Sequence, residues 1–483
     1  MAGDSRMRVM FFAPSETGHM MPLLYIAEAV ARLGHEVLVC TSDFHEAKWK
    51  AHVDRVGGKL IPIDTGGETF ESWEKKVEAS GEIPFVPLNK LWREPVRKLL
   101  ASVDPKPNVI VADFGALAAM DMAQDSGISL VMNLPAPLTL INSAFGIPDP
   151  GASCQCGGLF MGFSCFAGIK LAMALNLMGM NTMCRSLLKH LKHSVVLANT
   201  FFGLDQPQLL APNLVVTGPL LPPAPALRER LRSGHPELSA WLRQPGAPDV
   251  VLISTGTLAT LSAWQVRTLY AAVKQAKIRA VWSLREGQQQ YLPANAKDDP
   301  SFWISSWIPQ AELMSDEAIK LVLTHSGWGS TLECIVSGQP VICVPFFGDQ
   351  FTNADLLVKS GCGEVIYKRK PRVDWRPSNT YREGDFTASS AAAVLQKVLS
   401  EPRYKESALK LQRLALATGG AAEAARAIER AGRCGTGHLL SKDLTRSFGG
   451  NIFHSLFTAI SASLVGLACC LSKPAGAACG CGI

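Results

Sequence analysis

Short apolar runs recur along the first part of the chain and predict buried strands at residues 9–13, 36–40, 109–112 and 130–133. Between the first two runs, residues 22–33 place Leu, Ile, Ala and Val at helical spacing, and Gly34 ends that helix. Residues 14–19 are then the turn between strand and helix. Because strands alternate with helices, we expect a parallel sheet covered by helices on both faces.

The same alternation begins again after a stiff connector at residues 218–225, which contain Gly-Pro and three further prolines. Helices are predicted at residues 262–276 and 388–431, and strands at residues 250–254, 280–284, 304–307, 321–324 and 340–345. The chain is therefore predicted to be α/β, with two doubly wound domains that face each other across a cleft. The expected ranges are residues 1–222, residues 223–432 and a C-terminal tail at 433–483.

Three segments depart from the alternation. Residues 151–192 are rich in Met, Phe, Gly and Ala, which fits either a core or membrane-touching helix or the Met-lined wall of an apolar pocket. Residues 368–385 are polar and predict a surface loop. Residues 452–471 are uncharged and about long enough to span a bilayer, but they include several polar side chains. A membrane anchor, a docked amphipathic helix and a loose tail all remain open for that stretch.

No secretory signal is expected at the N-terminus, because residues 1–6 are polar and a core strand is predicted almost at once. A cytoplasmic location with reduced cysteines is therefore expected, with membrane association through the tail as the alternative. Apolar residues make up 47% of the chain and charged residues 18%, which predicts a packed fold rather than disorder. The net charge of +6 includes no basic run typical of a nucleic-acid-binding arm.

The 13 cysteines do not indicate a metal centre. Cys40, Cys334 and Cys343 lie in or beside apolar runs and are expected to be buried thiols. The Cys-x-Cys pairs at 154–156 and 479–481 have one-residue spacers, whereas structural zinc sites commonly use two to four, and no His pair lies nearby. No metal site is predicted.

The strongest chemical signal is Thr-His-Ser-Gly-Trp-Gly-Ser-Thr-Leu-Glu at residues 324–333. A strand ends at Thr324, a Gly-bearing turn follows, and a helix is expected to begin at Ser330. The N-terminus of a helix exposes unpaired N–H groups and a partial positive charge, which together favour phosphate. Many strand-to-helix turns contain glycine without binding any ligand. The neighbouring motifs therefore decide whether this turn is a phosphate site or an ordinary connection.

Two flanking motifs favour a nucleotide sugar. Trp307 lies upstream, where a rigid aromatic ring could stack on a base, and Gln310 follows it. Asp349 and Gln350 lie downstream of a buried strand, and an acid beside an amide matches the vicinal hydroxyls of a sugar as acceptor and donor.

In order and spacing, these motifs resemble the signature of the UDP-dependent glycosyltransferases of GT-B fold, the large family of plant and animal small-molecule glycosyltransferases. The matching elements are Trp307-x-x-Gln310, the block from His325 to Glu333, Gly338-x-Pro340 and Asp349-Gln350. Weaker agreement extends over most of residues 7–431. The resemblance implies two Rossmann-like domains facing across a cleft, no cofactor beyond a UDP-sugar donor substrate, and the following UDP-sugar-binding residues: Thr257, Trp307, Gln310, His325, Gly327, Trp328, Ser330, Glu333, Asp349 and Gln350.

Within that set the resemblance implies separate roles. Trp307 would stack on uracil, Gln310 would help to hold the nucleoside, and Glu333 would accept the ribose hydroxyls. The diphosphate would be contacted by His325, Ser330 and Thr257.

The sugar would be held by Trp328, Asp349 and Gln350, and Gln350 matches the glucose users of the family. One departure is Gly329, where plant members usually have an Asn that touches phosphate. A second feature is Asp349, where Asp rather than Glu is the commoner choice in animals. Both features put a plant-type sugar preference in doubt.

A catalytic base is predicted separately in the first half. His19 follows the first strand, and a neutral imidazole can take a proton from a hydroxyl near neutral pH. The family base occupies this same place; an isolated His here would otherwise simply close a turn. Asp113 ends another strand of the same sheet, where the partner acid of the family lies, although it could instead cap the following helix. Asp121 is a competing candidate for that partner.

The predicted function is inverting, metal-independent transfer of a sugar, with glucose preferred, from a UDP-sugar to a hydroxyl of a small, largely apolar acceptor. Two alternatives are a UDP-sugar epimerase and a non-catalytic sugar-nucleotide-binding subunit. The acceptor is not readable from the sequence, because it depends on the first half and its Met-rich segment.

Overall fold

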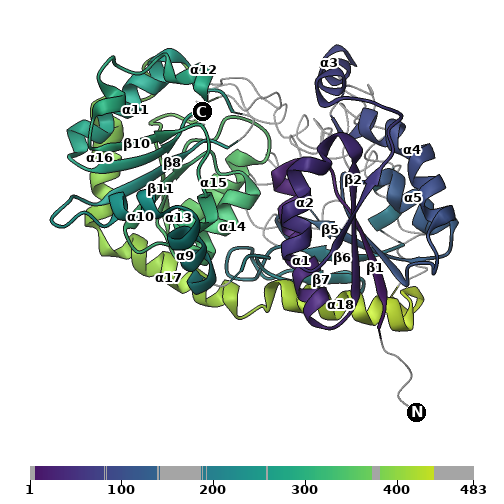
Figure 1. Ribbon diagram of the computed structural model, residues 1–483. Helices are drawn as coiled ribbons and strands as arrows, with labels where there is room; N and C mark the ends of the chain where they lie inside the picture. The colour runs from purple at the N-terminus through teal and green to yellow at the C-terminus, as the bar shows by residue number, and fades with distance from the viewer. Residues whose placement is uncertain are drawn as a thin grey trace, which may run out of the picture.

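The computed structural model contains two parallel sheets that lie side by side, each covered by helices (Figure 1). The structure describes residues 6–138 except 81 and 83, residue 141, residues 186–222 except 188 and 192, and residues 224–256, 259–371 and 381–439. All of the strand pairs in both sheets are parallel. This arrangement confirms the predicted α/β class with two doubly wound domains.

The first sheet has the strand order β3-β2-β1-β4-β5-β6-β7. Its strands are β1 (Arg8–Phe12), β2 (Glu36–Ser42), β3 (Lys59–Ile63), β4 (Val109–Asp113), β5 (Ser129–Leu134), β6 (Val195–Ala198) and β7 (Leu214–Val216). The helices among them are α1 (Thr17–Arg32), η1 (Asp43–His45), α2 (Glu46–Arg55), α3 (Phe70–Ser80), α4 (Phe85–Ser102) and α5 (Leu117–Asp125). The winding reverses between β1 and β4, so the loops after these two neighbouring strands open a crevice where ligands bind in such sheets.

The second sheet has the order β10-β9-β8-β11-β12-β13. Its strands are β8 (Val250–Ser254), β9 (Arg279–Ser283), β10 (Phe302–Ser305), β11 (Ile319–Thr324), β12 (Val341–Cys343) and β13 (Gly363–Val365). The helices that precede it or lie among its strands are α9 (Ala224–Gly234), α10 (Pro236–Leu242), α11 (Ala263–Ala276), α12 (Glu286–Gln289), η4 (Ala296–Asp298), α13 (Gln310–Met314), α14 (Trp328–Ser337) and α15 (Gln350–Lys359). Here the winding reverses between β8 and β11, where Ser254 pairs with Thr324.

The helical segments that the structure describes after the second sheet are α16 (Ala388–Ser400), α17 (Pro402–Leu416), α18 (Gly420–Cys434) and η5 (Gly437–Leu439). In Figure 1, α17 runs beneath the second sheet and α18 continues beneath the first. The apolar face of α18, including Ala424 and Ile428, packs with Val9 and Val111 in one core on that sheet. The predicted second domain, residues 223–432, therefore includes most of α18, although this helix packs in a core of the first domain.

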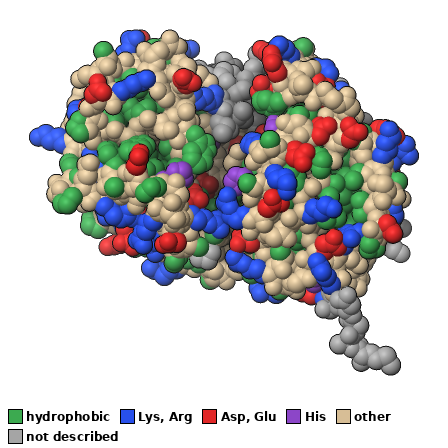
Figure 2. All heavy atoms as spheres, in the orientation of Figure 1, with side chains coloured by type: hydrophobic (Ala, Val, Ile, Leu, Met, Phe, Trp, Pro, Cys, Tyr) green, Lys and Arg blue, Asp and Glu red, His purple; other side chains and the backbone are tan. Residues whose placement is uncertain are grey.

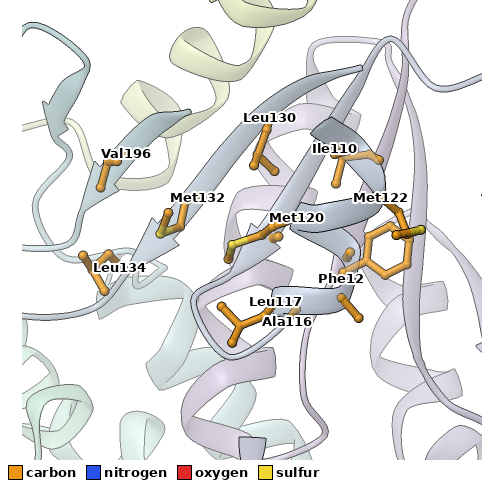
Figure 3. Packing of buried hydrophobic residues seen from close by; sticks show 14 of the residues in the cluster. Phe12, Ile110, Ala116, Leu117, Met120, Met122, Leu130, Met132, Leu134 and Val196 are labelled. Atoms are coloured by element: carbon orange, nitrogen blue, oxygen red, sulfur yellow. The ribbon is translucent and has the colours of Figure 1, made fainter. Parts of the chain in front are cut away.

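Each sheet has a separate apolar core on each of its two faces. Figure 3 shows one of them, where Ile110, Leu130 and Met132 of the first sheet meet Met120 and Leu117 of α5. The central strands read as continuous apolar runs because both of their faces are covered, which is the pattern that parallel sheets produce. Such rigid sheets hold the loops at their carboxyl ends in fixed positions.

The sequence places most strands within one or two residues of their observed ends, but it misplaces the start of α1. The helix begins at Thr17 rather than at Pro22, so His19 lies in its first turn and not in a connecting turn. Pro22 lies inside the helix, where it removes one main-chain donor without ending the helix. The expected strand at 304–307 ends earlier, at Ser305, and leaves Trp307 in the following loop.

The buried thiols are confirmed for Cys40, Cys334 and Cys343. No described helix has the length and apolar character needed to cross a bilayer. Residues 452–471, almost all of the Met-rich segment 151–192 and the Cys-x-Cys pairs at 154–156 and 479–481 lie outside the described residues.

Candidate active site

His19 and Asp113 meet at the crevice of the first sheet. His19 lies in the first turn of α1, Asp113 is the last residue of β4, and their Nδ1 and Oδ1 atoms are 2.8 Å apart. The side chain of Asp113 is fully buried, whereas that of His19 remains 18% exposed. A carboxylate only accepts hydrogen bonds, so Nδ1 carries the proton and the lone pair of Nε2 is free to act as a base.

The surroundings of this pair set its protonation. Burial alone lowers the pKa of His19, but the charge and hydrogen bond of Asp113, together with the charge of Glu16, raise it above its ordinary value of 6.5. The main-chain N–H of Gly115 donates a second hydrogen bond, 2.8 Å long, to the same Oδ1 of Asp113. Asp113 therefore uses its side chain to hold the turn after β4, and Ala116 rather than Asp113 caps α5.

Two aromatic rings flank the imidazole. The ring centroid of Phe85, the first residue of α4, lies 4.9 Å from that of His19, and Phe114 lies 5.2 Å away. Both phenylalanines are only partly buried. They therefore give the exposed edge of His19 an apolar rim.

The alternative partner, Asp121, lies elsewhere. Its Oδ1 is 2.9 Å from Nε2 of the fully buried His190 and 3.5 Å from Nζ of Lys189. Asp121 thus ties α5 to the segment before β6. The structure therefore selects Asp113 over Asp121 as the partner of His19.

In the second domain the predicted phosphate-binding turn joins β11 to α14. Gly327 is the N-cap of α14 and is followed by Trp328, so the helix begins two residues before the predicted Ser330. Ser326 has a left-handed backbone with φ of 61°, which turns the chain sharply from the strand. The N-terminal N–H groups of α14, those of Trp328 and Gly329 among them, are exposed by this turn without a side-chain cap.

His325 is enclosed by glycine backbone in this turn. A Cβ atom added to Gly256 would lie 2.5 Å from the imidazole, and one added to Gly327 would lie 2.4 Å from it. These two glycines are therefore required by close packing against the ring. Burial lowers the pKa of His325 to about 4, although a hydrogen bond to the backbone of Ser254 opposes this shift, so the ring is neutral at pH 7.

Gln310 organises a polar cluster beside the start of α14. Its Oε1 accepts a hydrogen bond of 2.5 Å from Ser254, and its Nε2 donates to Ser330 at 3.1 Å and to Glu333 at 2.5 Å. Burial raises the pKa of Glu333 to about 7; the Gln310 bond opposes this shift and the charge of Glu312 adds to it. The cluster joins residues from β8, α13 and α14.

Trp307 lies on the surface next to this cluster with 65% of its area exposed, which is unusual for the largest apolar side chain. Its ring centroid lies 5.7 Å from that of His235. An exposed, rigid indole is suited to stacking on a planar ligand.

Asp349 and Gln350 begin α15 and are held by different contacts. Asn353 donates to Asp349 at 2.7 Å and to the carbonyl oxygen of Ser326 at 3.0 Å, which links α15 to the turn before α14. Burial raises the pKa of Asp349, and the bond from Asn353 opposes the rise. Oε1 of Gln350 accepts from the N–H of Phe346 at 2.8 Å, so its NH₂ group turns away from that loop.

The indole of Trp328 joins the two domains. It is buried, and its Nε1–H donates to the carbonyl oxygen of Asn199 at 3.1 Å. This bond uses the only donor of the side chain, and the expected contact of Trp328 with a sugar stays a prediction. Thr257 lies outside the described residues.

Both halves of the candidate site lie at the cleft. Figure 2 shows a hollow between the two halves with histidine side chains on both of its walls. Tyr25, two turns after His19 on α1, lies close enough for the charges of Glu333 and Glu312 to act on it. Among the described residues, no group of three or more His, Cys, Asp or Glu side chains could hold a metal ion.

Solved structures agree with this architecture. Os79 from O. sativa, in complex with UDP, aligns with a TM-score of 0.67 and 19% identity over 87% of this chain and 99% of that one. Medicago truncatula UGT71G1, complexed with UDP-glucose, aligns with a TM-score of 0.66 and 17% identity over 88% and 98%. The fold is therefore that of the GT-B glycosyltransferases.

Sequence comparison identifies the family. The family described as "UDP-glucoronosyl and UDP-glucosyl transferase" matches residues 160–416, more than half of the chain, and the chain belongs to this family. UDP-glycosyltransferase 72E1 of Arabidopsis thaliana is 30% identical over 240 residues, 44% of this chain and 47% of that protein. An anthocyanidin 3-O-glucosyltransferase of Gentiana triflora is 31% identical over 233 residues, 47% and 48% of the two chains. The chain thus spans about half the length of these relatives.

Proposed function

We propose that this chain transfers a sugar from a UDP-sugar to a hydroxyl group of a small, largely apolar acceptor. The observation that carries the proposal is the contact of 2.8 Å between His19 and Asp113, with the imidazole partly exposed at the cleft. A protein that only binds a sugar nucleotide has no need of a base in this position. Membership of the family and the complexes of similar structures with UDP or UDP-glucose support the donor class.

The proposed reaction is a single displacement. Nε2 of His19 takes the proton of the acceptor hydroxyl, and the oxygen forms a bond to the anomeric carbon. The bond between that carbon and the diphosphate oxygen breaks, and UDP leaves with the electron pair. Attack from the face opposite to UDP inverts the configuration, so an α-linked donor gives a β-glycoside. Asp113 stabilises the imidazolium that forms.

The second domain supplies the proposed donor site. Trp307 would stack on uracil, Glu333 and Gln310 would hold the ribose, and the N-terminus of α14 with His325 would stabilise the leaving diphosphate. This arrangement leads us to propose transfer without a metal ion. The check is activity in excess EDTA, which should match activity in added Mg²⁺.

Glucose is the proposed sugar, with Asp349 and Gln350 as its ligands, since several similar proteins are named as glucosyltransferases. Their names also include anthocyanidin and flavonol acceptors, so a phenolic compound is the first acceptor to test. Screening several UDP-sugars against phenolic and sterol acceptors would identify both substrates.

Release of UDP, measured with and without an acceptor, tests the reaction class. A transferase releases UDP and forms a glycoside only when an acceptor is present. An epimerase changes the UDP-sugar without an acceptor, and a binding subunit does neither. His19→Ala should abolish transfer while calorimetry still shows UDP binding; near-normal turnover in this variant would exclude His19 as the base.

A further inference from the structure

Asn89 lies on α4, behind the turn that follows Asp113, and its side-chain amide is fully engaged with main chain. Nδ2 donates to the carbonyl oxygen of Phe85 at 2.6 Å and to that of Gly115 at 2.8 Å. Oδ1 accepts from the N–H of Ala118 at 2.7 Å. Exchanging the amide oxygen and nitrogen would bring oxygen against two carbonyl oxygens, so the hydrogen-bond pattern determines the orientation.

These bonds lead directly to the acid of the candidate dyad. Gly115, whose carbonyl oxygen Asn89 holds, donates its N–H to Oδ1 of Asp113 at 2.8 Å. The same Oδ1 accepts the bond from Nδ1 of His19. Oδ2 of Asp113 is buried and has no hydrogen-bond partner among the described residues, so Oδ1 makes the contacts that orient the carboxylate.

Asn89 also holds the opposite side of the imidazole. By binding the carbonyl oxygen of Phe85 it anchors the first residue of α4, whose ring lies 4.9 Å from His19. The ring of Phe85 also packs closely against Gly115, because a Cβ atom on Gly115 would lie 2.8 Å from it. The side chain of Asn89 therefore contacts both Gly115, which orients Asp113, and Phe85, whose ring packs against His19.

We propose that Asn89 is a positioning residue for the His19–Asp113 pair, acting through Gly115 on the acid and through Phe85 on the base. The proposal rests on the proposed function only for the catalytic consequence of this positioning. Among the described residues, the charged groups that act on His19 are Asp113 from β4 and Glu16 next to the start of α1. Loss of Asn89 leaves Glu16 in place and loosens Asp113.

The first test follows protonation of His19 directly. Diethyl pyrocarbonate modifies the neutral imidazole, so the pH dependence of His19 modification, measured by peptide mass spectrometry, gives the midpoint of its titration. In Asn89→Ala we expect this midpoint to fall by about half a pH unit or more, because the Asp113 carboxylate no longer holds the proton on Nδ1 as firmly. The midpoint should fall similarly in Asn89→Ser, and this variant replaces Asn89→Ala in the test if the Ala variant does not fold.

Asn213 provides a matched control in the same domain. Its Nδ2 also donates to two carbonyl oxygens, those of Leu191 at 2.8 Å and Ser194 at 2.7 Å, but no contact connects it to Asp113. Asn213→Ala should lower thermal stability without moving the His19 midpoint. The proposal is wrong if folded Asn89 variants keep the wild-type midpoint, or if Asn213→Ala moves it equally.

Turnover supplies the second measurement. With the donor and acceptor found for the wild type, Asn89→Ala should lower kcat about tenfold or more, with KM for the UDP-sugar changed by less than about twofold, since misplacing a general base slows only the chemical step. If the wild type forms no glycoside at all, the proposed function fails, but the titration of His19 still decides the role of Asn89.

Discussion

The indole N–H of Trp328 donates a hydrogen bond of 3.1 Å to the carbonyl oxygen of Asn199, and this bond connects the two domains. Trp328 is the first residue of α14, so the bond ties the turn after β11 to the loop after β6. Domains joined by small interfaces commonly move relative to each other. This buried bond joins the two domains beside the candidate donor site.

Removing that bond should destabilise the junction. In Trp328→Phe the aromatic packing is largely kept, but the buried carbonyl oxygen of Asn199 loses its partner, which costs about 1–3 kcal/mol. We expect the free energy of unfolding in urea to fall by that amount. An unchanged free energy would mean that water replaces the indole N–H.

The second prediction concerns Asp113. Its charge and hydrogen bond raise the pKa of His19, so Asp113→Asn should lower that pKa and move the acid limb of kcat/KM to lower pH. The plateau should also fall, by roughly 100-fold or more, because the imidazolium loses its counter-ion. A pH–rate profile for the wild type and the variant measures both effects. If the acid limb of Asp113→Asn stays at the wild-type pH, it reports the ionisation of a group other than His19.

The third prediction concerns Glu333, whose pKa burial raises to about 7. A carboxyl group with a raised folded-state pKa contributes stability below its unfolded value, near 4.5, and loses this contribution as the pH rises through 7. Glu333→Gln cannot ionise, so above pH 7 it should be more stable than the wild type, by up to about 2–3 kcal/mol, and equally stable near pH 4.

Thermal unfolding of both proteins between pH 4 and 9 tests this prediction. The same variant should bind UDP more weakly if Glu333 accepts the ribose hydroxyls. A constant difference in stability across this range would show that Glu333 ionises normally in the folded protein.

The fourth prediction concerns Trp307. Because 65% of its surface is exposed, Trp307→Ala should leave the melting temperature almost unchanged. If the indole stacks on uracil, UDP affinity should fall by about 1–3 kcal/mol, and Trp307→Phe should retain part of it. Calorimetric titration with UDP gives both values. His235→Ala is a useful comparison, because that ring contacts Trp307 at 5.7 Å without being part of the proposed stack.

The dyad was predictable because both of its residues follow apolar runs that the sequence displays clearly. His19 follows β1 and Asp113 ends β4, and the carboxyl ends of adjacent parallel strands meet at one edge of a sheet. The fold class was predictable for the same reason. Strands β3, β6, β7 and β13 were missed. Three of them, β3, β7 and β13, are partly buried edge strands, whereas β6 is a fully buried run of only four residues.

The supporting residues could not be found from spacing. Asn89 and Asn353 act by donating to carbonyl oxygens of turns that are distant in sequence, and any polar helix position looks the same before the fold is known. Ser254 was predicted only as the last residue of a strand, yet it orients Gln310. The bond from the indole of Trp328 to Asn199 was likewise not foreseen, because a sequence motif does not reveal which donors the protein itself already uses.

The packing of α18 on the first sheet has a consequence for biosynthesis. The ribosome delivers β1 to β7 long before residues 420–434, so this face of the first sheet has α1 and α2 in its core but lacks α18 while the entire second domain is made. Until α18 is made, the apolar surface that its Ala424 and Ile428 cover has no partner, and such transiently exposed surface favours aggregation. The first domain can therefore complete its core only after the second domain has been synthesised.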